Sequence, residues 1–138
     1  MNSIEINYWA VLVAAVSNMI IGSIWYGPLF GKLWMKHMGH SAEKMNELKK
    51  RSMGKLYFVA FIGSFVMAYV LAHFAAVWGV GDVMGAVQLA FWIWLGFVAT
   101  VVLSSVLWEG KSVTLYILNI AYYLVVLKVM AIILVVWK

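Results

Sequence analysis

Apolar residues dominate four stretches of the chain, and polar residues gather in the short segments between them. The apolar runs cover residues 4–24, 56–78, 83–108 and 113–137. At about 1.5 Å per residue, each run is close to the ~20 residues that a helix needs to cross a hydrocarbon core of about 30 Å. The pattern predicts an all-α integral membrane protein, with residues 1–138 as a single domain of four transmembrane helices in two hairpins.

Positive charge is concentrated between the first and second apolar runs. Seven of the ten Lys and Arg residues lie there: Lys32, Lys36, Lys44, Lys49, Lys50, Arg51 and Lys55. The loops between the other runs, residues 79–82 and 109–112, are short. Basic loops stay on the cytoplasmic side of a membrane. We therefore predict that this basic loop is cytoplasmic and that both termini lie outside.

The chain is predicted to leave the bilayer just after the first run. Trp25, Tyr26 and Trp34 have amphipathic rings that prefer the depth of the lipid head groups. Pro28 cannot continue a helical hydrogen-bond ladder, and the ammonium of Lys32 needs water or phosphate. These residues are the predicted interfacial anchor.

Composition excludes several classes of partner. The chain is 66% hydrophobic and only 11% charged, so lipid is the expected solvent for most of its surface. The net charge of +5 reflects the basic loop and does not indicate nucleic-acid binding. Within that loop, Ser41–Met53 is predicted to be a short amphipathic helix on the membrane surface, where its basic residues would attract anionic lipids.

Metal and cofactor binding are not expected. The chain has no cysteine, which excludes disulfides and thiolate metal sites. His37 and His40 carry ligands that copper, nickel or zinc use, but loop histidines beside lysines are usually solvated. We predict no metal and no cofactor.

Small residues recur every four positions in three of the runs. In lipid, such ridges allow the close backbone approach that drives helix association. We expect them to pack the bundle and to contribute to a homo-oligomer. The three ridges are Ala10, Ala14, Asn18 and Gly22; Ala60, Ser64, Ala68, Ala72 and Ala76; and Gly96, Thr100 and Ser104.

Lys128 is the only charged residue deep inside a predicted span. Intramembrane ionisable residues are functional candidates, because a charge at such a depth is costly. His73 and Gln88 are predicted at a similar depth, so the three side chains are candidates to line a pocket for a small solute. The alternatives are that Lys128 snorkels to the interface and that His73 makes an interhelical hydrogen bond.

Further polar residues lie in the opposite half of the spans. Asn18, Ser104, Ser105, Asn119 and Tyr123 are predicted to make hydrogen bonds between helices. Asn119 and Tyr123 lie on the face of the fourth helix opposite Lys128.

Several stretches resemble a family of small bacterial four-span membrane proteins that is catalogued only as a domain of unknown function. They are Trp25-Tyr26-x-Pro28-Leu29-Phe30-Gly31-Lys32-x-Trp34-Met35, Trp94-Leu95-Gly96-Phe97-Val98, Glu109-Gly110 and Asn119-x-x-Tyr122. The resemblance implies a multi-pass protein of the bacterial cytoplasmic membrane. It implies no activity, substrate or catalytic residue.

The spans contain no catalytic constellation, such as a Ser-His-acid set or paired carboxylates, so we do not expect an enzyme. The favoured function is permeation or binding of a small solute or anion. The alternative is a structural or accessory subunit of a membrane complex, without transport activity.

Overall fold

The computed structural model describes residues 5–38 and 53–137, and these residues are helical with no strands. Four stretches are long and apolar enough to cross a membrane: Tyr8–Leu29, Gly54–Val77, Val83–Leu107 and Val113–Val136. They agree with the four apolar runs and indicate a multi-pass membrane protein. The predicted helix at Ser41–Met53 lies outside the described residues, apart from Met53, which begins a spanning helix.

The first span combines two kinds of helix. α1 (Tyr8–Ile24) is capped by the Asn7 side chain, which accepts from the backbone N–H groups of Trp9 and Ala10. It continues as the π-helix η1 (Trp25–Leu29), in which the Phe30 N–H donates to the Trp25 carbonyl at 2.9 Å. The helix thus runs past the point at which Pro28 was expected to end it. α2 (Gly31–Met38) follows directly.

The remaining spans begin and end at recognisable signals. Asp82 and Ser112 cap the N-termini of α5 (Val83–Ile93) and α8 (Val113–Val136), accepting from backbone N–H groups at 2.8 and 3.0 Å. Gly79 and Gly110 have φ of 64° and 69°, the left-handed conformation that often closes a helix C-terminus. The third span is interrupted, and α5 is followed by η2 (Trp94–Ala99), α6 (Thr100–Val102) and α7 (Ser104–Leu107).

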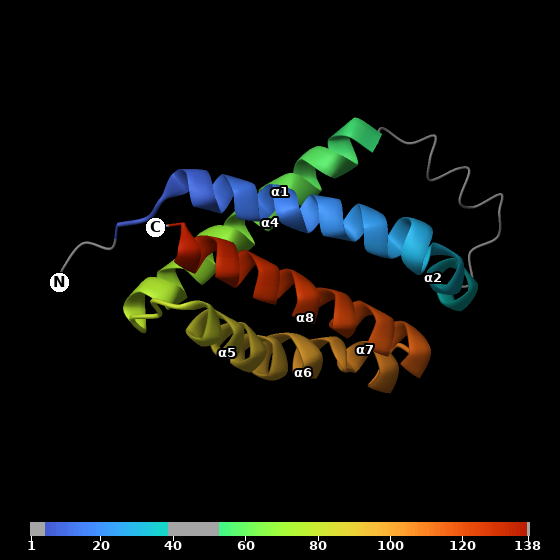
Figure 1. Ribbon diagram of the computed structural model, residues 1–138. Coiled ribbons are helices and arrows are strands. Elements are labelled where there is room, and N and C mark those ends of the chain that lie inside the picture. Colours follow the sequence, from blue (N-terminus) through green and yellow to red (C-terminus); the bar gives the residue numbers. More distant parts are fainter. Residues whose placement is uncertain (1–4, 39–52, 138) are drawn as a thin grey trace.

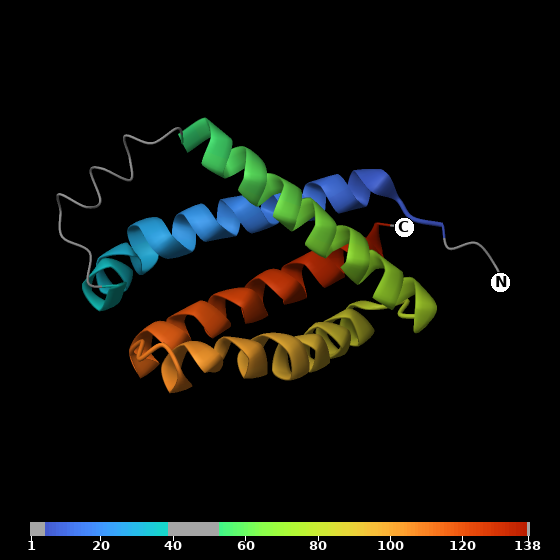
Figure 2. The same cartoon turned by 180° about the vertical axis from the view of Figure 1, so that it is seen from behind.

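α8 is the central helix of the bundle. Figure 1 shows it between α1 on one side and the α5–α7 span on the other. α4 (Met53–Val77) crosses the bundle obliquely, and Figure 2 shows it from behind. The fully buried Val126 and Met130 of α8 pack in this core together with Val11 of α1.

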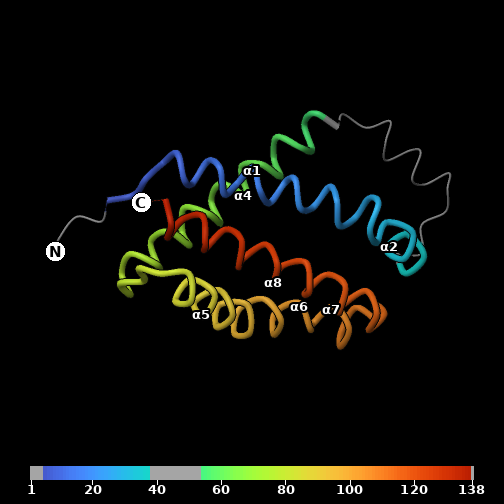
Figure 3. Tube along the Cα trace, in the orientation of Figure 1, coloured from blue at the N-terminus to red at the C-terminus, as the bar shows by residue number. Residues whose placement is uncertain are grey.

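Both ends of the described chain lie at the same end of the bundle, as Figure 3 shows. The Asn7 side-chain amide donates to the Trp137 carbonyl at 3.1 Å, which ties the start of α1 to the end of α8. Four exposed tryptophans mark the ends of the spans, with Trp9, Trp78 and Trp137 at one end and Trp108 at the other, while Trp92 is exposed within the third span. This distribution is typical of aromatic belts at membrane interfaces.

Candidate functional site

A chain of hydrogen bonds joins three helices near the middle of the bundle. The Tyr122 hydroxyl of α8 donates to the side-chain and backbone carbonyls of Asn18 in α1. The Asn18 amide donates to the Ser64 hydroxyl of α4 at 2.7 Å, and Ser64 donates to the Ala60 carbonyl at 3.0 Å. Asn18 and Ser64 are the buried polar residues of the described chain.

Small residues leave room for this series of hydrogen bonds. Ala10, Ala14 and Asn18 of the first ridge are buried, and so are Ser64 and Ala68 of the second. One turn beyond Asn18, Gly22 faces the Tyr122 ring, and a Cβ there would lie 2.9 Å from the Tyr122 hydroxyl oxygen. The two ridges therefore pack the bundle from within, with one polar residue in each ridge bonded to the other.

Aromatic rings from η1 pack on the same turn of α8. The Tyr26 hydroxyl donates to the Asn119 side-chain carbonyl at 2.6 Å, and its ring centroid lies 5.2 Å from that of Tyr122. Trp25 packs between Phe30 and Tyr122, with centroid distances of 4.8 and 6.2 Å. These contacts fix η1 against α8.

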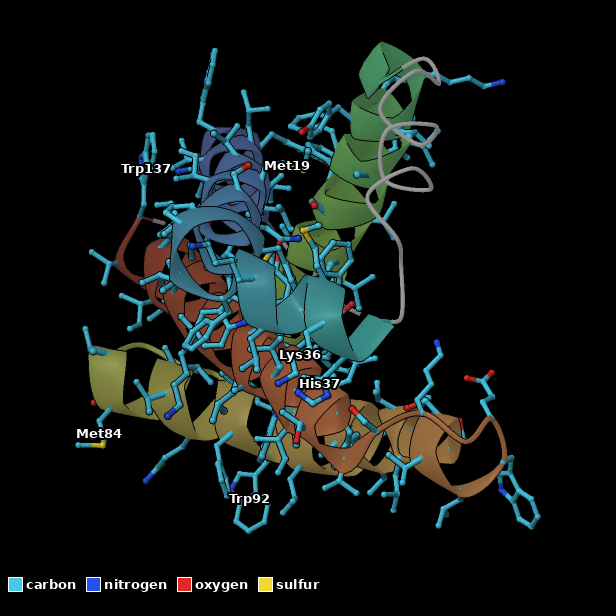
Figure 4. The ribbon with its side chains drawn as sticks, turned by 90° about the vertical axis from the view of Figure 1, so that its right-hand side faces the viewer. Met19, Lys36, His37, Met84, Trp92 and Trp137 are labelled. Atoms are coloured by element: carbon cyan, nitrogen blue, oxygen red, sulfur yellow. The ribbon has the colours of Figure 1, made fainter. Side chains whose placement is uncertain are left out.

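A cavity of about 670 Å³ lies beside these hydrogen-bonded side chains, between α1 and α4. The first half of α4 diverges from α1, as Figures 1 and 2 show, and the cavity is open, not enclosed. Its lining comes from residues 18–27 of α1 and η1, residues 57–67 of α4, and Tyr122 and Tyr123 of α8. Figure 4 labels Met19, another lining residue, which lies on the α4 side of α1.

The described residues of the lining are uncharged and combine apolar surface with a few hydrogen-bonding groups. Tyrosines contribute four of the hydroxyl groups: Tyr26, Tyr57, Tyr122 and Tyr123. Tyr26 and Tyr122 already donate to asparagine oxygens, whereas the hydroxyls of Tyr57 and Tyr123 have no hydrogen-bond partner among the described residues. The part of the lining that the structure describes therefore offers two phenol donors that are free within it, and no charged group.

A second cavity of about 480 Å³ lies at the other end of the contact between α1 and α4. Its lining includes Glu5, Asn7, Ala72 and Ala76. Between the two cavities the helices touch through buried small residues such as Ala14 and Ala68. We call the first the inner cavity and the second the outer cavity, following the predicted topology.

The residues predicted to line a solute pocket lie elsewhere. Lys128 is half-buried on α8 and makes no hydrogen bond or ion pair with any described residue. The His73 Nδ1 lies 2.9 Å from the Tyr69 carbonyl in its own helix, and the two rings are in contact. Gln88 is exposed on α5. None of the three lines a cavity described above, so a solute site at these residues stays a prediction.

The other predicted polar residues differ in their contacts. Asn18 and Asn119 bond to neighbouring helices, as described above. Ser104 instead donates to the Val101 carbonyl of its own span at 2.9 Å. Ser105 and Tyr123 are half-buried, and their side chains make no hydrogen bond within the described ranges 5–38 and 53–137.

The predicted interfacial anchor divides into two groups. Trp25, Tyr26 and Trp34 are half-buried, and Trp34 packs edge-on against Tyr26 with a centroid distance of 5.6 Å. Pro28 and Lys32 are exposed. The rings thus hold η1 and α2 to the bundle, and Lys32 remains free to reach head groups.

His37 is the one predicted metal-ligand candidate that the described ranges include, since His40 lies outside them. Its Nδ1 lies 3.3 Å from the Ser112 hydroxyl, and Figure 4 shows Lys36 and His37 on α2 above the first turn of α8. No group of three or more metal-ligating side chains is found among the described residues.

Two contributors to the site were not singled out by sequence reasoning. Tyr122 and Trp94 entered the sequence analysis only through the family resemblance. In the structure, the Trp94 Nε1 donates to the Ile120 carbonyl at 2.7 Å. One signal was available: Trp25-Tyr26-Gly27 and Trp94-Leu95-Gly96 share the order Trp-x-Gly, and both begin π-helices. Both π-helices contact α8 at residues 119–122.

Comparison with known proteins adds a family. A family model described as "Protein of unknown function (DUF1761)" matches residues 9–135. The match confirms the resemblance to a domain of unknown function. No curated protein and no solved structure matches the chain.

Proposed function

Since the chain belongs to the DUF1761 family of proteins of unknown function, we propose that this multi-pass membrane protein binds a small ligand in the inner cavity. One observation carries the proposal: the bonded Tyr122, Asn18 and Ser64 side chains lie in the wall of an open cavity of about 670 Å³. Ligand pockets usually measure about 300–1,000 Å³ and combine mostly apolar walls with a few fixed polar groups. The inner cavity has both properties.

The protein acts here as a binding protein and not as an enzyme. The described lining residues of the inner cavity contribute no carboxylate, imidazole or thiol for acid, base or nucleophilic chemistry. Its polar groups are amide and hydroxyl groups, which orient a ligand through hydrogen bonds.

Permeation of a small solute is a second candidate, supported by the outer cavity. The inner and outer cavities lie at the two ends of one helix contact, and small residues and the Asn18–Ser64 bond close the path between them. A solute would pass if α4 moved away from α1. If the protein permits permeation, uncharged glycerol should enter proteoliposomes faster than it enters protein-free liposomes.

The accessory-subunit alternative rests on the third ridge. Gly96, Thr100 and Ser104 are all exposed in the described part of the chain, whereas the other two ridges contain buried members such as Ala14 and Ala68. A second copy or another membrane protein would cover the third ridge. Homo-oligomerisation, which the sequence predicts, is compatible with ligand binding and permeation as well, and it would use the same exposed ridge.

Gly63 offers a direct test of ligand binding. It lines the inner cavity, and a Cβ at this position meets nothing within 4 Å, so we expect the larger side chain of Gly63→Leu to be tolerated and to occupy part of the cavity. Gly54→Leu is the matched control, because Gly54 lies in the same helix, also has open space, and is absent from the lining.

The measurement is native mass spectrometry of protein purified in mild detergent. We expect wild type and Gly54→Leu to retain a bound small molecule that Gly63→Leu loses. Identical retained masses in all three proteins would contradict the proposal.

A further inference from the structure

We infer that the ligand of the inner cavity is an uncharged lipid that enters from the bilayer and presents hydroxyl or carbonyl groups to Tyr57 and Tyr123. The inference rests on the proposed function and names the class of ligand. Three observations carry it: the charge of the lining, the free donors in it, and the side on which the cavity opens.

The first observation is the absence of charge in the lining. Among the described residues, those that line the inner cavity include no Lys, Arg, His, Asp or Glu. A charged head group there would lose its hydration without gaining a counter-charge from these residues, which is unfavourable in a low-dielectric site. Anionic phospholipids and charged solutes are therefore disfavoured.

The second observation is the pair of free donors. The phenol hydroxyls of Tyr57 and Tyr123 have no partner in the part of the chain that the structure describes, and Asn18 uses one of its two amide hydrogens on Ser64. Hydrocarbon offers no acceptor to a hydroxyl group. A ligand with hydroxyl, ester or ketone oxygens would satisfy these donors, whereas a pure hydrocarbon chain would not.

The third observation is the direction of the opening. The first half of α4 diverges from α1 (Figure 2), and this half of the helix contributes Tyr57 and Ala60 to the lining while its neighbouring side chains Leu56, Phe58 and Val59 are exposed and apolar. Because this half of α4 belongs to a segment that can span a membrane, an opening on this side would meet lipid tails first. A molecule with an apolar tail and an uncharged polar end would fit such a site, with its tail among the lipids and its polar end at Tyr123.

The test uses thermal unfolding of the purified protein in detergent with three added probes. Dioleoylglycerol is the uncharged lipid, dioleoylphosphatidate has the same acyl chains with an anionic head group, and glycerol is the head group without a tail. Ligands that bind the folded state raise the unfolding midpoint in proportion to their occupancy.

We expect dioleoylglycerol to raise the midpoint of wild type and Gly54→Leu but not that of Gly63→Leu. Dioleoylphosphatidate should shift all three proteins alike, because its contacts are with exposed basic residues such as Lys32 and Lys55. Glycerol should shift none of them. A Gly63-dependent shift with dioleoylphosphatidate or glycerol, and none with dioleoylglycerol, would overturn the uncharged-lipid inference and leave ligand binding in place.

If no probe gives a Gly63-dependent shift, the uncharged-lipid inference fails. The mass-spectrometric comparison then decides the proposed function separately, because it requires no added ligand.

Two tyrosines of α8 refine the test. Tyr123→Phe removes a free hydroxyl and should weaken dioleoylglycerol binding roughly three- to ten-fold, the equivalent of one hydrogen bond. Tyr116→Phe removes a hydroxyl that donates to the Ala99 carbonyl at 2.6 Å, away from the cavity. It should lower the midpoint without ligand and leave the affinity unchanged. Equal affinities of Tyr123→Phe and wild type would contradict the role of this hydroxyl.

Discussion

The Asn18 side-chain amide donates to the Ser64 hydroxyl at 2.7 Å, and this bond joins the only polar member of the first ridge to the only one of the second. Ser64 lies near the middle of α4 (Met53–Val77), whose first half diverges from α1 (Figure 2). The contact therefore has two roles: it holds the helices together and it forms one wall of the inner cavity.

A double-mutant cycle measures this bond. Asn18→Ala and Ser64→Ala should each destabilise the protein, with a coupling energy of about 0.6 kcal/mol, the average for such bonds in membranes, and at most about 1.7 kcal/mol. Asn18→Ala should cost more, because it also leaves the buried Tyr122 hydroxyl without its side-chain acceptor. Unfolding by a denaturing detergent in mixed micelles gives the energies. Additive effects of the two substitutions would show that the bond contributes nothing.

Gly22→Ala should destabilise the protein by about 1–3 kcal/mol, the usual effect of overpacking a tight contact. The new Cβ would lie 2.9 Å from the hydroxyl oxygen of Tyr122, which is buried and held by Asn18. Gly27→Ala is the control, since a Cβ there meets nothing within 4 Å. In a Tyr122→Phe background, which lacks the clashing oxygen, Gly22→Ala should cost less. An equal cost in both backgrounds would place the strain elsewhere.

The two π-helix tryptophans should differ in their tolerance of Phe. Trp94→Phe loses the hydrogen bond to the Ile120 carbonyl, whereas the buried Trp25 Nε1 has no hydrogen-bond partner in the described part of the chain. Both substitutions remove the same volume. Unfolding of the two variants should therefore differ by about 0.6–1.7 kcal/mol, with Trp94→Phe less stable. The opposite order would mean that the indole N–H of Trp25 has an acceptor such as a bound ligand or a lipid.

The spans were predictable because length and apolar composition are local properties of the sequence. The same holds for the helix caps, since Asp82 and Ser112 stand directly before apolar runs. The ridges predicted close packing, and Ala14 and Ala68 are indeed buried.

The candidate site was not predictable in the same way. Whether Asn18 meets Ser64 depends on the crossing angle of α4, which no local pattern encodes. The π-helices at Trp25 and Trp94 shift the register of the residues after them, so a strict 3.6-residue period misplaces faces beyond each Trp. Lys128 was the most conspicuous residue in the sequence because it is charged, yet the polar groups of the inner cavity are neutral side chains that are common in membrane spans.

The predicted topology can be tested with single cysteines, because the sequence contains none. Asp82→Cys lies in the loop before α5, and Lys111→Cys lies in the loop before α8, at opposite ends of the third span. With the basic loop cytoplasmic, a membrane-impermeant maleimide should label only position 82 in intact cells and both positions after lysis. Labelling of position 111 alone in intact cells would invert the topology.

Lys128→Met should stabilise the protein. Lys128 is half-buried in α8 and forms no ion pair with any described carboxylate, and placing a charge at the centre of a span costs about 2.5–3.5 kcal/mol on insertion scales. Snorkelling reduces that cost, so we expect a gain of roughly 1 kcal/mol in unfolding free energy. Lys111→Met is the control, because the exposed pair of Lys111 and Glu109, 3.7 Å apart, should contribute less than about 0.5 kcal/mol.

The same variant tests the sequence-based prediction of a solute site at Lys128, His73 and Gln88. If Lys128 only snorkels, Lys128→Met should be more stable than wild type. It should also keep the rise in unfolding midpoint with dioleoylglycerol, because Lys128 lies about one and a half helix turns from Tyr123, the nearest lining residue of the inner cavity on α8. If Lys128 binds an anion or approaches a second copy, the ammonium already has its counter-charge or water, so its removal should lower stability and reduce chloride flux into proteoliposomes. Native mass spectrometry on the same samples would show whether the substitution also changes the oligomeric state. A changed state would indicate a contact between copies, and an unchanged state an anion site within one chain.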